Sequence, residues 1–254
     1  MQQFVKSRER PPSGSIPDVL QMFRAEVRFY REIAPDVGVR VPACHEATDD
    51  EHGTRLVIED LTSWDPGADP CDAARTLALM HARWEGKAAT RWPWLRRVGD
   101  GKGAEIVGAL YDKTWPVLAR RHDLSRPVRR IGHRLLGRMA AAAGERTAGT
   151  VTLVHGDASL RNMRTSRNGE VALLDWEDVR AAPGVADLAW LLVSSVYPEA
   201  WDDVIGAYGP APHLSTVLPA AIVQGLLSLA DEAAGSTEAA GWLDRLDTAC
   251  RRLN

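Results

Sequence analysis

Three oxygen-bearing side chains, Asp157, Asn162 and Asp175, lie beside two apolar segments of the chain. Val151–Val154 precedes Asp157, and Val171–Leu174 leads directly into Asp175. We expect the two segments to pair as strands of one hairpin, which would bring the three side chains to the same end. Carboxylate and amide oxygens suit Mg²⁺, a hard cation that also takes substrate phosphates as ligands. The pattern predicts Mg²⁺ held by Asn162 and Asp175, with Asp157 free to orient an attacking hydroxyl and accept its proton.

The spacing of these residues makes the pattern more specific. Asn162 follows Asp157 by five positions, and Asp175 comes after a short hairpin with its turn at Asn168-Gly169. This order is typical of a kinase catalytic loop, in which an Asp is the base and an Asn and a later Asp bind metal. The triplet that begins at His155 is weak evidence alone, because similar triplets occur in metallohydrolases and in ordinary turns.

The segments HGDASLRN (155–162) and LDWED (174–178) resemble the signature of the aminoglycoside phosphotransferase and choline kinase-like family. The segment GVADLAWLL (184–192) resembles the helix that follows the metal-binding Asp in this family. The resemblance implies an α+β, protein-kinase-like two-lobe fold, with a truncated N-terminal β lobe and a mostly helical C-terminal lobe. We expect residues 1–61 to form a small nucleotide-binding lobe that lacks its first two strands. Residues 62–254 would form the helical lobe with the catalytic loop and the acceptor site.

The resemblance also implies a Lys–Glu pair that holds the α- and β-phosphates of the nucleotide. Lys6 lies in Gln3–Ser7, which looks like the end of a strand, and Glu26 lies in a helix predicted for residues 18–34. Both residues match the order of the pair, a Lys on a strand and a Glu on the next helix. The alternatives are a solvated surface lysine and a helix-surface carboxylate paired with a neighbouring arginine.

The segments Val39–Ala47 and Thr54–Ile58 are predicted to form a hairpin whose second strand continues into Glu59, Asp60 and Leu61. In the resembled family this position is the hinge between the lobes, where main-chain N–H and C=O groups contact the adenine edge. We therefore expect these three residues to bind the nucleotide through their backbone. An ordinary strand end with a polar turn is the alternative.

Supporting roles are implied for three further residues. His155 is expected to brace the catalytic loop by hydrogen bonding, and Asp187 to accept backbone hydrogen bonds from that loop. Arg161, inside the loop, is a candidate contact to phosphate or substrate. His81, near the end of the predicted helix ARTLALMHARW (74–84), is expected to be packed and hydrogen-bonded rather than catalytic.

Composition excludes several other classes of protein. The chain has 254 residues, 45% of them hydrophobic, so it can bury a sizeable core. A net charge of −3 does not indicate nucleic-acid binding, and no apolar run is long enough for a membrane span or a secretory signal. Cys44, Cys71 and Cys250 match no metal or disulfide pattern, so we expect reduced thiols and a cytoplasmic location.

These features predict phosphorylation of a small-molecule hydroxyl by ATP or GTP with Mg²⁺. The acceptor stays open between an aminoglycoside or other antibiotic, which would imply antibiotic resistance, an amino alcohol and a sugar. No glycine-rich loop precedes Lys6. This favours a second hypothesis, a catalytically impaired nucleotide-binding or regulatory member of the same fold.

A third hypothesis is a metal-dependent hydrolase that uses His155 and Asp157, but the sequence offers no further ligands at metal spacing.

The short small lobe also has a consequence for assembly. It would expose an edge strand, which could pair with a second copy of the chain in a homodimer.

Overall fold

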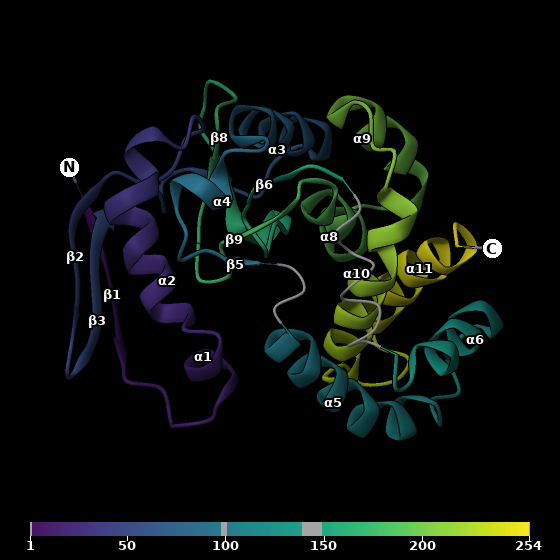
Figure 1. Ribbon diagram of the computed structural model, residues 1–254. Coiled ribbons are helices and arrows are strands. Elements are labelled where there is room, and N and C mark those ends of the chain that lie inside the picture. Colours follow the sequence, from purple (N-terminus) through teal and green to yellow (C-terminus); the bar gives the residue numbers. More distant parts are fainter. Residues whose placement is uncertain (1, 98–100, 139–148, 254) are drawn as a thin grey trace.

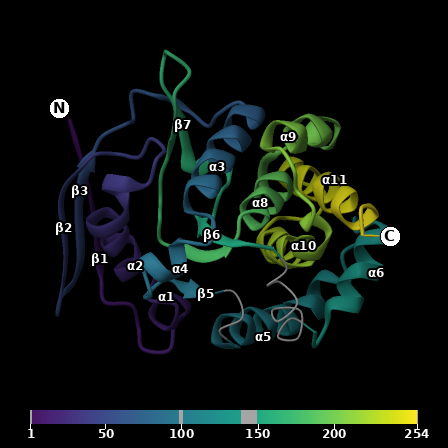
Figure 2. The same ribbon diagram turned by 45° about the horizontal axis from the view of Figure 1, so that its top comes forward.

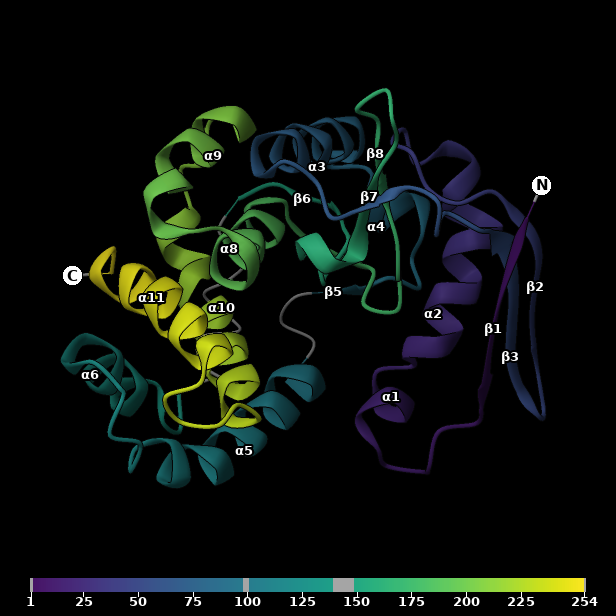
Figure 3. The same cartoon turned by 180° about the vertical axis from the view of Figure 1, so that it is seen from behind.

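The computed structural model describes residues 2–97, 101–138 and 149–253. Figure 1 shows a small sheet on one side of the molecule and a group of helices on the other, with short strands between them. The N-terminal end lies beside the small sheet, and the C-terminal end lies on the opposite side, among the helices (Figure 3). The chain is therefore a mixed helix and strand protein with a mostly helical C-terminal part.

The small sheet is antiparallel and has the strand order β1-β3-β2. Its strands are β1 (Gln3–Glu9), β2 (Cys44–Asp50) and β3 (Gly53–Glu59). The central strand β3 buries Leu56, Val57 and Ile58, whereas β1 lies at the edge and is mostly exposed. Strands β2 and β3 confirm the predicted hairpin, but its first strand begins at Cys44 rather than Val39 and continues to Asp50, into the residues predicted as the turn. Lys6 lies opposite Leu56 in the middle of β1.

The segment predicted as one helix over residues 18–34 is divided into shorter pieces. These are α1 (Ile16–Val19), α2 (Met22–Arg28), the π-helix η1 (Phe29–Ile33) and the 3-10 helix η2 (Ala34–Asp36). Gln21 separates α1 from α2 and has a φ of +50°, in the left-handed region that interrupts a right-handed helix. The prediction of a continuous helix was therefore wrong. Its apolar face is nevertheless buried, with Val27, Phe29 and Ile33 inaccessible to solvent.

The pairing predicted for the two apolar segments around the catalytic loop was also wrong. The remaining strands are β4 (Asp65–Pro66), β5 (Arg96–Arg97), β6 (Val151–Val154), β7 (Met163–Thr165), β8 (Val171–Leu173) and β9 (Arg180–Pro183). Strand β6 pairs with β9, and β8 pairs with β7. The turn at Asn168-Gly169 does form a hairpin, but with β7 as the first strand, because three residues after Asn162 extend into a strand of their own.

Helices make up most of the described residues after β4. They are α3 (Pro70–Trp84), α4 (Ala88–Arg91), α5 (Gly101–Leu118), α6 (Arg126–Leu135), η3 (Leu160–Asn162), α8 (Val185–Ser195), η4 (Pro198–Ala200), α9 (Trp201–Tyr208), α10 (Leu214–Ala230) and α11 (Thr237–Arg251). Helix α8 is apolar and buried along most of its length, because α3, α10 and α11 all pack against it (Figures 1 and 2). Within the described residues, no helix combines the length and apolarity needed to cross a membrane.

Candidate active site

The catalytic-loop candidate, residues 155–162, begins where strand β6 ends. Its second residue, Gly156, has a φ of +91°, a conformation that favours glycine. A Cβ atom at this position would lie 2.2 Å from the carbonyl oxygen of Asp178. Glycine therefore lets the loop pass directly against the segment that follows Asp175.

The carboxylate of Asp157 is held by donors on both of its oxygens. The indole Nε1 of Trp190 donates to Oδ1 at 2.6 Å. On the other side, Nδ2 of Asn162 and Nη2 of Arg161 donate to Oδ2 at 2.9 and 3.0 Å. The side chain keeps an exposed fraction of 24%. A fixed and partly exposed carboxylate can still accept a hydrogen bond from a substrate hydroxyl.

Asn162 connects the catalytic loop to the Asp175 segment. Its Nδ2 also donates to the backbone oxygen of Asp157 at 3.0 Å, so the amide oxygen is the atom available to a cation. Its own backbone oxygen accepts from the N–H of Leu174 at 2.9 Å, next to Asp175. The Asp175 side chain is 46% exposed. A carboxylate and an amide oxygen on neighbouring segments are a donor set that fits Mg²⁺.

Lys6 lies at the centre of three carboxylates. Its Nζ is 2.8 Å from Oε2 of Glu26 on α2, 2.7 Å from Oδ1 of Asp175 and 2.7 Å from Oε1 of Glu177. The structure thus joins Lys6 and Glu26 as the resemblance implies, and it adds the proposed metal ligand to the same cluster. What this cluster does in catalysis stays a prediction.

Burial and neighbouring charges shift the pKa values of Glu26 and Lys6. Burial raises the pKa of Glu26 to about 7, and the charge of Lys6 offsets only part of that rise. Burial alone would lower the pKa of Lys6, but Glu26 and Asp175 outweigh it and raise this pKa well above its ordinary value. The ammonium therefore stays charged, and the carboxylates around it hold an excess of negative charge that a cation would neutralise.

The segment around Asp175 has a strained backbone, and close packing holds it in place. Asp175 has a φ of +62°, a left-handed conformation that costs a non-glycine residue about 1–2 kcal/mol. The next residue, Trp176, is fully buried and stacks on Phe29 with ring centroids 3.9 Å apart and planes 8° apart. Because Phe29 directly follows α2, this stack connects the Asp175 segment to the helix that carries Glu26.

Asp187, in the first turn of α8, anchors the start of the catalytic loop. Its Oδ2 accepts the backbone N–H of His155 at 2.7 Å, and its Oδ1 accepts the N–H of Gly156 at 2.9 Å. His81 Nε2 lies 3.1 Å from the same carboxylate. Burial opposes ionisation of Asp187, but the hydrogen bond and charge of His81 hold its pKa below the ordinary value. Asp187 and His81 thus have the hydrogen-bonded positions expected from the sequence.

His155 braces the loop from the inside. Its Nε2 lies 2.7 Å from the carbonyl oxygen of Leu174, and its Nδ1 accepts the N–H of Asp157 at 3.2 Å. Because a carbonyl only accepts, Nε2 carries the proton in this arrangement. The ring therefore links the base candidate to the residue before Asp175.

The expected hinge, Glu59 to Leu61, has most of its polar groups occupied. Glu59 donates its N–H to the carbonyl oxygen of Ala43 at 2.8 Å, and its carboxylate pairs with Arg40. The N–H of Asp60 donates to the carbonyl oxygen of Gln2 at 3.0 Å. Among the described residues, the N–H of Leu61 has no acceptor. No hydrogen bond joins the hinge to the described residues of the catalytic loop.

Three residues of the site were not predicted from the sequence. Trp190 contacts the base candidate, Glu177 contacts Lys6, and the hydroxyl of Ser159 is buried in the catalytic loop without a described partner. A tryptophan at helical spacing is typical of a core residue, and Trp190 is indeed 4% exposed. The contact of its Nε1 with Asp157 depends on the fold, which places α8 next to the catalytic loop.

The profile of the family described as "Phosphotransferase enzyme family" (APH) matches residues 9–221 of the sequence. The chain belongs to this phosphotransferase family. The match includes every candidate residue except Lys6, which precedes it. No protein of curated function matches the sequence.

Solved structures share the fold at low sequence identity. An aminoglycoside phosphotransferase, APH(3'')-Id from Streptomyces rimosus ATCC10970 in complex with ADP and streptomycin, is 16% identical; the match covers 89% of this chain and 86% of that one, with a TM-score of 0.59. Choline kinase LicA from Streptococcus pneumoniae is 17% identical, with 98% and 86% covered and a TM-score of 0.58. Spectinomycin phosphotransferase APH(9)-Ia, in complex with ADP and spectinomycin, is 10% identical, with 97% and 84% covered and a TM-score of 0.55.

The family and the fold confirm two predictions from the sequence. The chain resembles aminoglycoside phosphotransferases and choline kinases, and it has their kinase-like fold with a helical C-terminal part. As a member of the phosphotransferase family it is a small-molecule kinase, an enzyme that phosphorylates alcohol groups.

Proposed function

We propose that this kinase transfers the γ-phosphoryl group of ATP, bound with Mg²⁺, to a hydroxyl of a small molecule. The observation that carries the proposal is the contact of Lys6 with both Glu26 and Asp175, in a fold that also fixes Asp157 through Asn162. The ADP named in two of the similar structures supports an adenine nucleotide. GTP is the alternative donor.

Phosphoryl transfer has a loose transition state, so positioning and electrostatics supply most of the catalysis. Asp157 orients the acceptor hydroxyl in line with the γ-phosphorus. As the new O–P bond forms and the bond to ADP breaks, the hydroxyl proton passes to Asp157. The hydrogen bonds from Trp190 and Asn162 keep the carboxylate in one orientation during this step.

Other residues bind the nucleotide. Lys6, held by Glu26, neutralises the α- and β-phosphates, and the backbone of Glu59 to Leu61 contacts the adenine, with the Leu61 N–H as donor. Asp175 and Asn162 would hold Mg²⁺, which would neutralise the charge of the phosphate oxygens. Arg161 is exposed beside Asp157 and contacts a phosphate or the acceptor.

Trp190, which contacts Asp157, belongs to a group of aromatic rings and guanidinium groups. Trp190 lies near Trp242, with ring centroids 6.1 Å apart, and the guanidinium of Arg245 lies 4.9 Å from the Trp242 ring. Arg161 approaches from the loop. Arg161 is paired with Asp157, so its charge does not select between cationic, neutral and anionic acceptors. A screen for the acceptor therefore includes both antibiotics and metabolites.

The test is a screen of hydroxylated metabolites and antibiotics with ATP and Mg²⁺, read by the mass gain of one phosphate. A phosphorylated product that Asp157→Asn fails to form supports the proposal. The alternative of an impaired or regulatory member predicts Mg²⁺-dependent ATP binding without turnover on any acceptor. Near-parental turnover by Asp157→Asn would show that another group accepts the proton.

We also propose that the enzyme is located in the cytoplasm, where ATP is supplied.

We further propose that it forms a homodimer through strand β1. This strand lies at the sheet edge, and Phe4 and Val5 on it are 46% and 50% exposed. Exposed edges with apolar side chains pair readily with other strands. Light scattering should report a dimer that Phe4→Lys converts to a monomer. A parent protein that is monomeric at micromolar concentration would exclude this interface.

A further inference from the structure

Tyr208, the last residue of helix α9, connects this helix to the anchor of the catalytic loop. Its hydroxyl lies 2.8 Å from Nδ1 of His81 on α3, and Nε2 of the same ring lies 3.1 Å from Oδ2 of Asp187 on α8. The carboxylate of Asp187 in turn accepts the N–H groups of His155 and Gly156. Hydrogen bonds therefore run without a break from α9 to the start of the catalytic loop.

His81 is only 5% exposed, so a partner for each ring nitrogen offsets the cost of burying the imidazole. The ionised carboxylate of Asp187 only accepts hydrogen bonds, so Nε2 carries a proton toward it. A hydroxyl both donates and accepts, so Tyr208 pairs with Nδ1 whether or not this atom carries a proton. Burial raises the pKa of Tyr208 above its ordinary value, which keeps the hydroxyl protonated. The hydroxyl thus holds the ring with Nε2 directed at Asp187.

Gly184, which directly precedes α8, lets the two polar atoms meet. A Cβ atom at this position would lie 2.7 Å from Nδ1 of His81 and 2.7 Å from the hydroxyl oxygen of Tyr208. Thr152 of β6 holds the α3 side of the contact, because its hydroxyl donates to the carbonyl oxygen of His81 at 2.6 Å. Helices α3, α8 and α9 pack against one another around this point (Figures 1 and 2). The position of the ring is therefore set by the packing of three helices.

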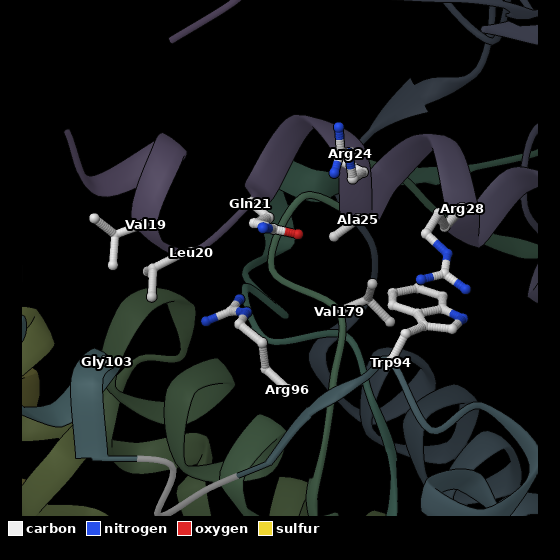
Figure 4. A pocket seen from close by; sticks show the side chains of 10 residues that line it. All are labelled: Val19, Leu20, Gln21, Arg24, Ala25, Arg28, Trp94, Arg96, Gly103 and Val179. Atoms are coloured by element: carbon white, nitrogen blue, oxygen red, sulfur yellow. The ribbon is translucent and has the colours of Figure 1, made fainter. Parts of the chain in front are cut away.

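Tyr208 lines a cavity that is separate from the proposed phosphoryl-transfer site. This cavity has a volume of about 410 Å³, and His81 lines it as well. None of the described residues that line it belongs to the catalytic loop or to the Lys6 cluster. Another cavity, of about 460 Å³, is lined by residues of α1, α2 and β5 (Figure 4), and it includes neither Tyr208 nor His81. The contacts of Tyr208 thus lead to the loop through His81 and Asp187 rather than through a bound substrate.

We propose that Tyr208 is a positioning residue for phosphoryl transfer, which acts through His81 and Asp187 to hold the loop that carries Asp157. The inference rests on the proposed function, in which Asp157 is the base. Loss of the hydroxyl leaves Nδ1 of His81 buried without this partner, so the ring no longer holds Nε2 toward Asp187. The carboxylate then loses a fixed donor, and its two loop N–H groups are held less firmly.

The direct test is hydrogen exchange in the full chain, read by NMR at the N–H groups of His155 and Gly156. Tyr208→Phe keeps the ring and removes the hydroxyl, and exchange at both positions should become about tenfold faster relative to the N–H groups of β3. The matched control is Tyr111→Phe, since the Tyr111 hydroxyl also makes a hydrogen bond, at 2.9 Å to the carbonyl oxygen of Gly132. This contact joins α5 to α6, so the control should leave the two loop positions unchanged relative to β3.

Two further variants test the path from Tyr208 to the loop. Gly184→Ala should have the same effect as Tyr208→Phe, because the added methyl must separate Tyr208 from His81. Its control is Gly206→Ala in α9, where the methyl would meet open space among the described residues and exchange should stay parental. In the Asp187→Asn background, Tyr208→Phe should change exchange by less than about twofold, because the carboxylate is already lost. A full additional effect in that background would overturn the proposal.

Steady-state kinetics with an acceptor found by the screen test the consequence for catalysis. Tyr208→Phe should lower kcat about fivefold and leave the KM for ATP within about twofold of the parental value, whereas Tyr111→Phe should keep the parental kcat. Circular dichroism shows that each variant is folded. A folded Tyr208→Phe variant with parental exchange at His155 and Gly156, or with parental kcat, would overturn the proposal.

Failure of the proposed function would look different. A parent that phosphorylates no acceptor would contradict that function, and with it any role of Tyr208 in the reaction. The exchange measurement needs no acceptor, so it would still decide whether the Tyr208 hydroxyl holds the loop.

Discussion

The indole nitrogen of Trp190 lies 2.6 Å from Oδ1 of Asp157. This contact joins the buried helix α8 to the residue proposed as the catalytic base. The ring itself is almost completely buried, so its position is fixed by the core rather than by the loop. The core of the helical part therefore sets the orientation of the carboxylate, and the loop adds the donors on its other oxygen.

Replacing Trp190 with Phe tests this link. The ring stays but the donor is lost, and a hydrogen bond to a charged group contributes about 1.5–3 kcal/mol. We expect kcat to fall about tenfold or more, with little change in the KM for ATP. Trp84→Phe is the matched control, because its indole donates to a backbone oxygen away from the site, and its kcat should stay near the parental value. A parental kcat in Trp190→Phe would mean that the contact does not position the base.

Asp187→Asn tests how the catalytic loop is anchored. The carboxylate accepts N–H groups from His155 and Gly156 on separate oxygens, whereas an amide offers one acceptor and directs its NH₂ group at a donor. We expect the free energy of unfolding to fall by about 3 kcal/mol at neutral pH. Asp231→Asn, at an exposed position, should change it by less than about 0.5 kcal/mol.

The ionisation of Asp187 predicts how the stability difference between the parent and Asp187→Asn depends on pH. The pKa of Asp187 is lower in the folded protein than its ordinary value, so the folded state favours the ionised form. Its contribution to stability is present above pH about 4 and is lost as the pH falls through the folded pKa. Urea titrations should show that the difference between parent and Asp187→Asn is constant near neutrality and shrinks in acid. A difference that grew in acid would contradict this assignment.

Gly156→Ala tests the close approach of the loop to Asp178. The residue has a positive φ, and the added methyl would meet a backbone oxygen at 2.2 Å. We expect a loss of about 3 kcal/mol in stability and a larger loss in activity, because the backbone must move at the base. Gly169→Ala is the control: it also has a positive φ, but open space surrounds it, and we expect a loss of about 1 kcal/mol. Equal losses in thermal unfolding would refute the steric explanation.

Residue order predicted which side chains of the site lie close together better than it predicted the strand pairing. Asp157, Asn162 and Asp175 were found by type and spacing, and the fold brings their segments together. The predicted partner of Val151–Val154 was wrong, because β9 pairs with it across a long loop. A three-residue strand such as β7 has too few positions to show an alternating pattern.

Contacts that depend on packing could not be predicted from local pattern. Glu177 follows Asp175 by two residues, but only the φ of +62° at Asp175 and the Phe29–Trp176 stack direct it to Lys6. The break at Gln21 is a similar case, because apolar spacing alone predicted one continuous helix there. Periodicity reports which face is buried, and it does not report where the backbone leaves helical geometry.

The central claim is that Lys6, Asp175 and Asn162 form a site for ATP with Mg²⁺. Calorimetric titration with ATP, with and without Mg²⁺, tests it most directly when the parent is compared with Asp175→Ala. We predict that Mg²⁺ tightens ATP binding to the parent at least tenfold and has little effect on the variant. Absence of ATP binding by the parent, or the same Mg²⁺ effect in Asp175→Ala, would contradict the claim.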